Sequence, residues 1–253
     1  MDRGRLLSAL VGLADMAGTA IMPFYRTGAE VRRKEDSSPV TEADEAAEAL
    51  ILKGLAELTP EVPVVAEEAA AAGRVPDVAG GRFWLVDPLD GTREFIGGRG
   101  EFTVNIGLIE DGRPVLGVVT APAMGEAWWG AAGLGAWHRD ALGEEMIAVR
   151  PRPATGVIAV ASKSHSNPET EAFLDAEGVC ERIAAGSSLK FCRVAEGKAD
   201  VYPRLGRTME WDTAAAHAVL AAAGGSVSRL EDRTPLLYGK PGFENPHFIA
   251  RGG

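Results

Sequence analysis

The sequence contains few cysteines and no excess of positive charge. Its 253 residues include two cysteines, Cys180 and Cys192. Two thiols in a chain of this length suggest no disulfide framework, and their spacing matches no zinc motif, so a reduced, cytoplasmic setting is the simplest interpretation. Lysine and arginine total 26 against 36 aspartate and glutamate residues, which gives a net charge of -10 at pH 7. A general nucleic-acid-binding surface is therefore not expected.

Long hydrophobic runs are also missing. Arg3 and Arg5 precede an apolar stretch, as in a signal peptide, but Asp15 interrupts it. Apolar residues in this stretch repeat at helical spacing, which predicts an amphipathic structural helix that ends near Tyr25. No run approaches the length of a membrane span, so we expect no transmembrane segment.

Two phosphate-handling motifs are absent as well. The sequence has no Gly-x-x-x-x-Gly-Lys-Ser/Thr loop and no Cys–Arg nucleophile motif. These absences argue against the nucleoside triphosphatases and cysteine phosphatases built on those motifs. An anionic substrate is still compatible with the acidic composition, because bound cations invert the local field of an acidic site.

The composition and patterning predict a globular α/β protein. Hydrophobic residues make up 46% and charged residues 25% of the chain, as in ordinary globular proteins. Helical patterns cover the first 25 residues and residues 41–58, and short apolar runs follow with Gly or Pro between several of them, as in an antiparallel meander. After Pro153, strand and helix patterns alternate. We therefore predict an α+β N-terminal half, residues 1–153, and an α/β C-terminal half, residues 154–253.

A strand pattern runs directly into two acids in the stretch WLVDPLDGTREF, residues 84–95. Asp87 precedes a proline, so its backbone is extended, and we expect the strand to end there. Asp90 and Gly91 then turn the chain, and Thr92 opens a helix whose free amides favour phosphate. Two carboxylates beside an anion site suit a hard cation and phosphoryl chemistry. Asp–Gly turns and aspartate caps are also common for structural reasons alone.

Further acids occur where other predicted elements begin or end. Glu67 and Glu68 follow an apolar strand, Asp212 begins a helix, and Asp44 lies in the first turn of the helix that Thr41 caps. Each has an ordinary explanation, because Glu68 suits a solvated surface and the two aspartates suit helix caps. Acids at the ends of elements in four separate segments are harder to explain by chance and indicate a shared metal site.

These motifs together resemble the inositol monophosphatase superfamily of magnesium-dependent, lithium-sensitive phosphatases. The resemblance rests on DPLDGTREF, the EE pair upstream and WDTAA downstream, and it spans nearly the whole chain. It implies a layered αβαβα sandwich that holds two or three Mg²⁺ ions. The metal ligands it implies are the side chains of Glu67, Asp87, Asp90 and Asp212, the main-chain carbonyl of Leu89, and Asp44 for a weakly held ion. Thr92 would help Glu67 to orient and deprotonate the attacking water, with Asp90 as a third catalytic residue.

Other segments resemble the CysQ-type 3'(2'),5'-bisphosphate nucleotidases within that superfamily. They are SKSH from residue 162, GSSLKFCRVAEG, VYPRLG and GEFTVNIGLI. The substrate implied is adenosine 3',5'-bisphosphate, whose second phosphate needs basic partners. The substrate residues implied are Gly91, Thr92, Ser162, Lys163, His165, Ser187, Ser188, Lys190, Arg204 and Asp212. Arg204 is the most telling, because inositol phosphatases of the superfamily have an acid near this position.

Alternatives stay open for both the residues and the function. Lys163, Lys190 and Arg204 also fit surface positions, His165 fits a loop, and the two serines fit helix caps. The same metal mechanism would serve inositol phosphates or fructose 1,6-bisphosphate, and a non-catalytic metal- or nucleotide-binding module would keep the fold. We expect His217 to pack within its helix. Trp128, Trp129 and Trp137 would lie in the core or in the interface of a homodimer.

Overall fold

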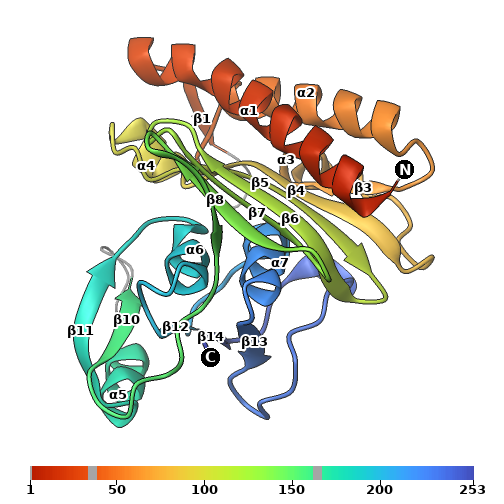
Figure 1. Ribbon diagram of the computed structural model, residues 1–253. Helices are drawn as coiled ribbons and strands as arrows, with labels where there is room; N and C mark the ends of the chain where they lie inside the picture. Colours follow the sequence, from red (N-terminus) through yellow and green to blue (C-terminus); the bar gives the residue numbers. More distant parts are fainter. Residues whose placement is uncertain (1, 34–38, 162–166) are drawn as a thin grey trace.

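Five layers alternate between helices and sheets in the computed structural model (Figure 1), which describes residues 2–33, 39–161 and 167–253. Helices α1 (Arg3–Thr27) and α2 (Glu42–Leu58) cover one face of a seven-stranded sheet. Helices α6 (Leu189–Ala195) and α7 (Ala214–Ala222) lie between this sheet and a five-stranded sheet. Helix α5 (Pro168–Ala176) packs on the second sheet from outside. This order confirms the αβαβα sandwich.

The larger sheet pairs its strands in sequence order, from β3 to β9. β3 lies parallel to β4, and each later pair of neighbours is antiparallel. The strands are β3 (Val64–Ala66), β4 (Arg82–Asp90), β5 (Thr103–Glu110), β6 (Arg113–Ala121), β7 (Glu126–Ala131), β8 (Gly135–Asp140) and β9 (Gly143–Ile147). The antiparallel meander predicted for this part of the chain is confirmed.

Strand β4 is longer than the sequence analysis predicted. Its pairing with β5 continues past Asp87 to Asp90, with a register shift between these two residues. Pro88 has no N–H to donate, and an irregularity of this kind lets a strand continue without that hydrogen bond. The expectation that the strand ends at Asp87 was therefore wrong, and both acids belong to one strand.

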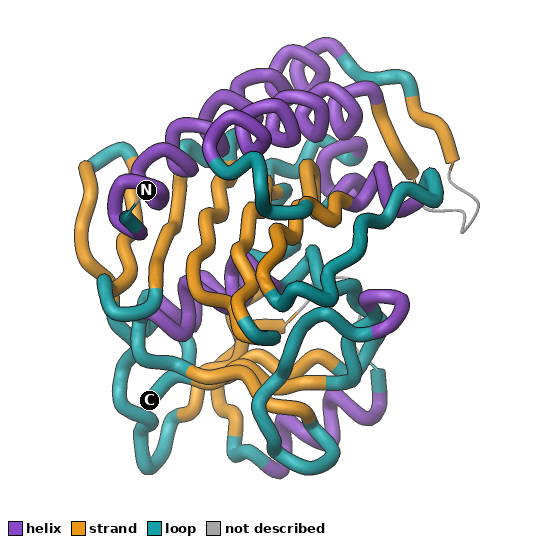
Figure 2. Tube along the Cα trace, turned by 90° about the vertical axis from the view of Figure 1, so that its right-hand side faces the viewer, coloured by secondary structure: helices purple, strands orange, loops and turns teal. Residues whose placement is uncertain are grey.

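The two long helices lie side by side above the larger sheet, as a view turned by 90° also shows (Figure 2). By length and composition alone, α1 could cross a membrane, which the sequence analysis did not anticipate. Its buried residues, among them Leu10 and Ile21, join a core formed by α2 and the sheet. The predicted structural helix is confirmed. Before α2, β1 (Val31–Arg33) and β2 (Pro39–Thr41) form a two-stranded ribbon.

The smaller sheet has the strand order β11-β10-β12-β14-β13. β10 is parallel to β11 and β12, whereas β14 is antiparallel to its two neighbours. The strands are β10 (Val157–Ala161), β11 (Val179–Ala184), β12 (Val201–Arg204), β13 (Ser226–Arg229) and β14 (Phe248–Arg251). The C-terminal half therefore contains the predicted parallel α/β unit, extended by an antiparallel pair.

Helix α7 joins the two halves through unusually close packing. A Cβ on Gly117 of β6 would lie 2.0 Å from the carbonyl oxygen of Ala215, and one on Gly107 of β5 would lie 2.8 Å from the Ala215 nitrogen. Glycine at these positions lets the alanine-rich helix lie directly on the sheet. One hydrophobic cluster consequently includes residues of both sheets. The division at residues 153 and 154 stays a prediction.

Candidate active site

Two acids lie at the end of β4, of which Asp87 is buried and Asp90 is half-buried. Asp87 is 1% exposed, and its Oδ1 atom accepts a hydrogen bond of 3.0 Å from the backbone N–H of Leu89. Gly91 then takes a φ of 91°, which favours glycine, and the five-residue helix α4 (Thr92–Ile96) follows. The short helix after Asp90 and Gly91 is confirmed.

Glu67 and Asp212 reach the same place from two other segments. Glu67 is the first residue of α3 (Glu67–Ala71), directly after β3, and β3 pairs in parallel with β4. Asp212 accepts a 2.9 Å hydrogen bond from the backbone N–H of Met209, whereas the N-cap of α7 is Thr213. Capping of α7 therefore does not explain Asp212. Both carboxylates lie close enough to Asp87 to repel its charge.

Burial and mutual repulsion shift the pKa values of three of these carboxylates, Asp87, Asp90 and Asp212, upward. Burial raises the pKa of Asp87 well above its usual range, and repulsion from the three neighbouring acids raises it further. Burial and repulsion from Asp90 raise the pKa of Asp212 to about 8. Within the described part of the chain, Asp87, Asp90 and Asp212 form no ion pair with a lysine or arginine. A close set of carboxylates with this excess of negative charge, of which Asp87 is buried and the other three are half-buried, fits hard divalent cations.

Asp44 occupies the capping box of α2. Its Oδ2 atom accepts hydrogen bonds from the backbone N–H (2.8 Å) and the hydroxyl (2.6 Å) of Thr41. One turn later, the buried carboxylate of Glu48 accepts from the backbone N–H groups of Glu68 and Ala69 and so holds the start of α3. The structural interpretation of Asp44 is confirmed, and its role toward a weakly held metal stays a prediction.

Glu48 was not identified from the sequence, although one signal was available. It lies four residues after Asp44, so both acids project from the buried face of α2 that also carries Ile51. Burial raises the pKa of Glu48, while its backbone donors lower it. An acid on the apolar face of a helix requires partners, and here the partners belong to the segment that begins with Glu67.

Thr92 and the main chain of Leu89 lie together at the start of α4. The Thr92 hydroxyl is 3.4 Å from the carbonyl oxygen of Leu89, to which it donates. This contact places the hydroxyl beside the carbonyl that was predicted as a metal ligand.

A polar cavity of about 140 Å³ connects these acids to basic residues. Asp90 and Asp212 line it together with Lys190 and Arg204. Lys190 is 6% exposed, donates a 2.6 Å hydrogen bond to the Ser187 carbonyl and lies 5.5 Å from the centre of the Tyr202 ring. Burial lowers the pKa of Lys190 to about 8, although the nearby carboxylate of Asp90 counteracts this. Lys190 therefore does not point to solvent, and the alternative of a surface lysine was wrong.

Arg204 is held at the edge of the same cavity. It donates a 2.9 Å hydrogen bond to the carbonyl oxygen of Arg207, and its Nε atom is buried without an acceptor among the described residues. Tyr202, two residues earlier on β12, also lines the cavity and was not identified from the sequence. One signal was available in the sequence: side chains alternate along a strand, so Tyr202 and Arg204 of VYPR lie on the same face of β12.

Ser187 and Ser188 fasten the α6 end of the cavity to the larger sheet. The Ser187 hydroxyl is 2.9 Å from the carbonyl oxygens of both Asp90 and Glu101. The Ser188 hydroxyl is 2.7 Å from Oδ1 of Asn105. Neither hydroxyl caps α6, so the helix-cap alternative was wrong. Gly91 lies against this turn, since a Cβ there would be 2.1 Å from the Ser187 hydroxyl oxygen.

Three of the predicted substrate residues, Ser162, Lys163 and His165, lie outside the described residues. The prediction that His217 packs within its helix is confirmed, because it is buried and its Nδ1 lies 2.9 Å from the hydroxyl of Tyr238. Trp128 and Trp129 are buried, which confirms the core position for these two.

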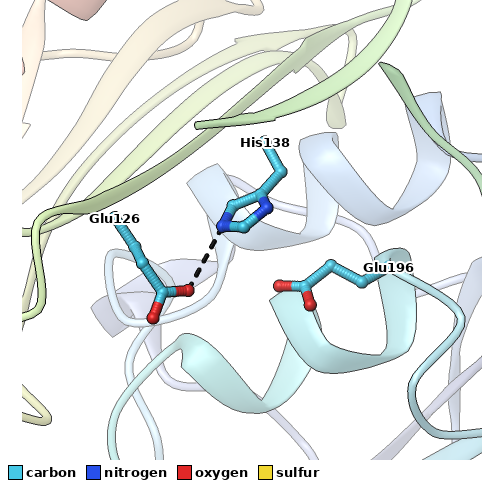
Figure 3. Close-up of side chains that lie close together, drawn as sticks. All are labelled: Glu126, His138 and Glu196. Carbon is cyan, nitrogen blue, oxygen red and sulfur yellow. Dashed lines mark hydrogen bonds and ion pairs between the residues drawn. The ribbon is translucent and has the colours of Figure 1, made fainter. Parts of the chain in front are cut away.

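A second cluster, formed by Glu126, His138 and Glu196, has side chains that point toward one another (Figure 3). They come from β7, β8 and the end of α6. Arg193 lies among them, since its Nη1 atom is 3.1 Å from Glu126 and 2.9 Å from Glu196. Glu196 also accepts a 2.6 Å hydrogen bond from the Trp128 indole. Lys198 also pairs with Glu196, so two cations balance the two carboxylates, and this cluster is an ion-pair network that docks α6 on the sheet.

Comparison with known proteins decides the family. The model of the inositol monophosphatase family matches residues 2–248. The chain belongs to the inositol monophosphatase family. The members of this family are metal-dependent phosphatases, which agrees with the buried carboxylate site.

Similar members of the family are known from bacteria. The chain is 48% identical to the 3'(2'),5'-bisphosphate nucleotidase CysQ of Salmonella typhimurium over 96% of this chain and 98% of the relative. It is 47% identical to the enzyme of the same name from Escherichia coli K12 over the same shares. The crystal structure of CysQ from Bacteroides thetaiotaomicron superposes with a TM-score of 0.84 at 36% identity, covering 98% of this chain and 97% of that one.

Proposed function

We propose that this family member is a metal-dependent 3'(2'),5'-bisphosphate nucleotidase that removes the 3'-phosphate of adenosine 3',5'-bisphosphate and releases AMP. The observation that carries the proposal is the cavity that Lys190 and Arg204 line together with Asp90 and Asp212. The acids suit a metal-bound phosphate, and the two basic residues suit a second phosphate on the same substrate. The 48% identity to a bisphosphate nucleotidase over nearly the whole of both chains supports the same substrate class.

The cations would be held by the side chains of Glu67, Asp87, Asp90 and Asp212 and the main-chain carbonyl of Leu89. We propose that the cations are two or three Mg²⁺ ions and that Asp44 helps to hold the third, more weakly bound ion. When bound, such ions lower the pKa of a water molecule and neutralise charge on the phosphoryl oxygens. They also offset the mutual repulsion that raises the pKa of Asp87 in the protein alone.

The protein side chains would provide proton transfer and orientation. Glu67 would accept one proton of the attacking water, and the Thr92 hydroxyl, which the Leu89 carbonyl orients at 3.4 Å, would fix this water in line with the scissile bond. The bond between phosphorus and the 3'-oxygen breaks as the water attacks, and the leaving oxygen takes a proton from solvent. Phosphoryl transfer requires positioning and charge neutralisation more than covalent help. Asp90 and Asp212 both line the cavity, and as metal ligands they would define where the phosphoryl group lies.

The rest of the substrate would bind on the α6 side. Lys190 and Arg204 neutralise the phosphate that is not hydrolysed, with Tyr202 as the apolar floor below Lys190. Ser187 and Ser188 act through their backbone, because their hydroxyl groups already bond to the larger sheet. Ser162, Lys163 and His165 complete the proposed set.

Phosphate release from a panel of substrates tests the proposal. The purified protein with Mg²⁺ should hydrolyse adenosine 3',5'-bisphosphate far faster than inositol 1-phosphate or fructose 1,6-bisphosphate, and chelation should abolish the release. Faster hydrolysis of either sugar phosphate would assign the protein to that substrate instead. Asp90→Asn should lose about 10³-fold or more in kcat while the fold is kept, because a metal ligand is lost. An unchanged trace rate would indicate a binding module or a contaminant.

A further inference from the structure

A buried acid next to the proposed metal site has no part in the reaction described above. Glu210 is 0% exposed, and its carboxylate accepts hydrogen bonds from the backbone N–H groups of Gly239 (2.7 Å) and Lys240 (3.0 Å). The ammonium group of Lys240 forms an ion pair with it at 2.5 Å. Glu210 therefore fastens the loop of residues 237–246 to the segment of residues 208–213.

Asn245 fastens the same two segments a short distance away. Its Nδ2 atom donates to the carbonyl oxygen of Met209 at 2.8 Å and to the Thr213 hydroxyl at 3.1 Å. Its backbone N–H donates to the carbonyl oxygen of Thr208 at 2.9 Å. The Nζ atom of Lys240 lies 3.2 Å from its Oδ1 atom, so Asn245 and Glu210 share one cation.

The residues held by these contacts surround Asp212 and include the donor to its carboxylate, Met209. The backbone N–H of Met209 donates to Oδ2 of Asp212 at 2.9 Å, so the position of Met209 determines how this carboxylate is turned. The carbonyl oxygen of Glu210 accepts from the backbone N–H groups of Thr213 (3.2 Å) and Ala214 (3.0 Å). Asn245 holds Met209 and Thr213, the residues on either side of the turn that carries Asp212.

We propose that Glu210 and Asn245 are positioning residues that fix the carboxylate of Asp212 in the orientation that a divalent cation requires. This inference rests on the proposed function, in which Asp212 is a metal ligand. Without a cation the acids around Asp212 repel one another, and this repulsion favours rotation of the Asp212 carboxylate away from the other acids. A fixed Met209 N–H and a fixed turn oppose that movement, and groups that orient metal ligands contribute strongly to metal affinity.

Metal binding by the protein alone separates positioning from a purely structural role. The probe is Mn²⁺, a hard cation whose free concentration is followed by electron paramagnetic resonance, without substrate and well below the melting temperature of every variant. Glu210→Gln keeps the shape of the side chain but places an amide beside three hydrogen-bond donors of Gly239 and Lys240. Asn245→Ser removes the hydrogen bonds from the Asn245 side chain to Met209 and Thr213. Each variant should bind Mn²⁺ about 10–100-fold more weakly than the parent protein.

Asp200→Asn is the matched control. Asp200 is likewise a buried acid, which accepts from the backbone N–H of Ile158 at 2.7 Å and from Arg150 at 2.6 Å, directly before β12. Its replacement should lower the melting temperature and leave the Mn²⁺ affinity within about 2-fold of the parent value, because Asp200 contacts no residue of the turn around Asp212.

The outcomes distinguish this inference from the proposed function. Asp212→Asn should lose Mn²⁺ affinity at least as strongly as the two positioning variants. If it does and both Glu210→Gln and Asn245→Ser bind Mn²⁺ like the parent, the positioning role is overturned while the metal site stands. If Asp212→Asn itself binds Mn²⁺ normally, the ligand assignment fails and the positioning role fails with it. If Glu210→Gln does not fold, the Mn²⁺ affinity of Asn245→Ser alone tests the positioning role.

Discussion

At the scale of single residues, Lys190 shows how burial turns an ordinary cation into a candidate substrate ligand. The sequence leaves open whether the lysine of LKFCRVA faces solvent, because a lysine in an otherwise apolar helix can extend its ammonium group to the surface. The structure buries it between Tyr202 and the Ser187 carbonyl, facing the cavity. A buried cation near Asp90 is suited to an anionic ligand, since the ligand would also relieve its desolvation.

Replacing Lys190 by methionine should weaken binding of the bisphosphate substrate. Methionine fills the apolar space beside Tyr202 but cannot neutralise a phosphate. The KM for adenosine 3',5'-bisphosphate should rise about 10–100-fold, the equivalent of a charge-assisted hydrogen bond of about 1.5–3 kcal/mol. Inositol 1-phosphate, which has no second phosphate, should show a much smaller change. Lys198→Met, at an exposed lysine paired with Glu196, is the control and should leave both KM values unchanged. An equal rise in KM for both substrates would show that Lys190 does not bind the second phosphate.

Gly91 offers a second test at this scale. Its φ is 91°, and a Cβ would lie 2.1 Å from the Ser187 hydroxyl oxygen, so Gly91→Ala should push the Ser187 turn away from β4. Gly98 has a φ of 67° with open space around its Cβ position, so Gly98→Ala carries the backbone cost without the clash. Each alanine should destabilise the protein by about 1 kcal/mol from its backbone alone. Gly91→Ala should also lose at least about 10-fold in kcat/KM. Similar activities of the two variants in steady-state kinetics would show that the turn has no role in catalysis.

At the scale of elements, the position of α6 depends on its far end as well as on the two serines. Arg193 is 14% exposed and lies between Glu126 of the larger sheet and Glu196 at the end of the helix. Its guanidinium group is also 5.2 Å from the centre of the Trp128 ring. The helix that carries Lys190 is therefore held on the sheet by a network that the cavity residues do not share.

Arg193→Met should destabilise the protein strongly, because it removes the guanidinium group from between Glu126 and Glu196 and leaves Glu196 with the exposed Lys198 as its cation. Loss of one partner from such a network costs about 3–5 kcal/mol, to be measured by urea unfolding. Arg182→Met is the matched control, since Arg182 forms a well-exposed pair with Glu171 (42% and 41%), and it should cost less than about 1 kcal/mol. A comparably small effect of Arg193→Met would mean that α6 is held by apolar packing alone.

The elements themselves show where prediction from the sequence succeeds. The capping box at Thr41 and Asp44 begins α2 as predicted, because caps are local signals. The continuation of β4 through Pro88 was missed, because a proline usually excludes a residue from a central strand and only the pairing with β5 reveals the irregularity. β11 was missed because its pattern, mostly exposed with Val179 and Ile183 half-buried, does not resemble a core strand.

At the scale of the whole molecule, sequence motifs identified the acids but not the scaffold behind them. The four carboxylates of the site come from motifs that can be read directly. The loop that supports Asp212 contributes Asn245 and Lys240, about 30 residues after Glu210, and its sequence has no pattern that indicates this contact. The insertion of β14 between β12 and β13 is likewise a long-range pairing that local patterns do not encode.

The clustered acids also make the stability of the metal-free protein depend on pH. The pKa of Asp212 is about 8 in the folded protein and 3.8 in the unfolded chain, and burial and the neighbouring acids also raise the pKa of Asp87 well above its usual value. The folded state therefore binds more protons than the unfolded state, so stability is highest at low pH and is lost as pH rises through the folded values. Two other buried groups do not affect stability between pH 6.5 and 8. His217 contributes to the pH dependence of stability only below 6.5, its pKa in the unfolded chain, and Lys190 only above about 8, its pKa in the folded protein.

In a chelating buffer, we expect stability to fall by about 1 kcal/mol for each pH unit in this window, which corresponds to about one proton, that of Asp212. The melting temperature should fall by about 2–4 °C for each kcal/mol. Saturating Mg²⁺ should raise the melting temperature at pH 8 and flatten its pH dependence, because bound cations keep the carboxylates ionised. Asp212→Asn should have a weaker pH dependence without metal and gain less from Mg²⁺. Equal pH slopes with and without Mg²⁺ in scanning calorimetry would contradict cation binding by these acids, since a cation that binds ionised carboxylates must displace their protons.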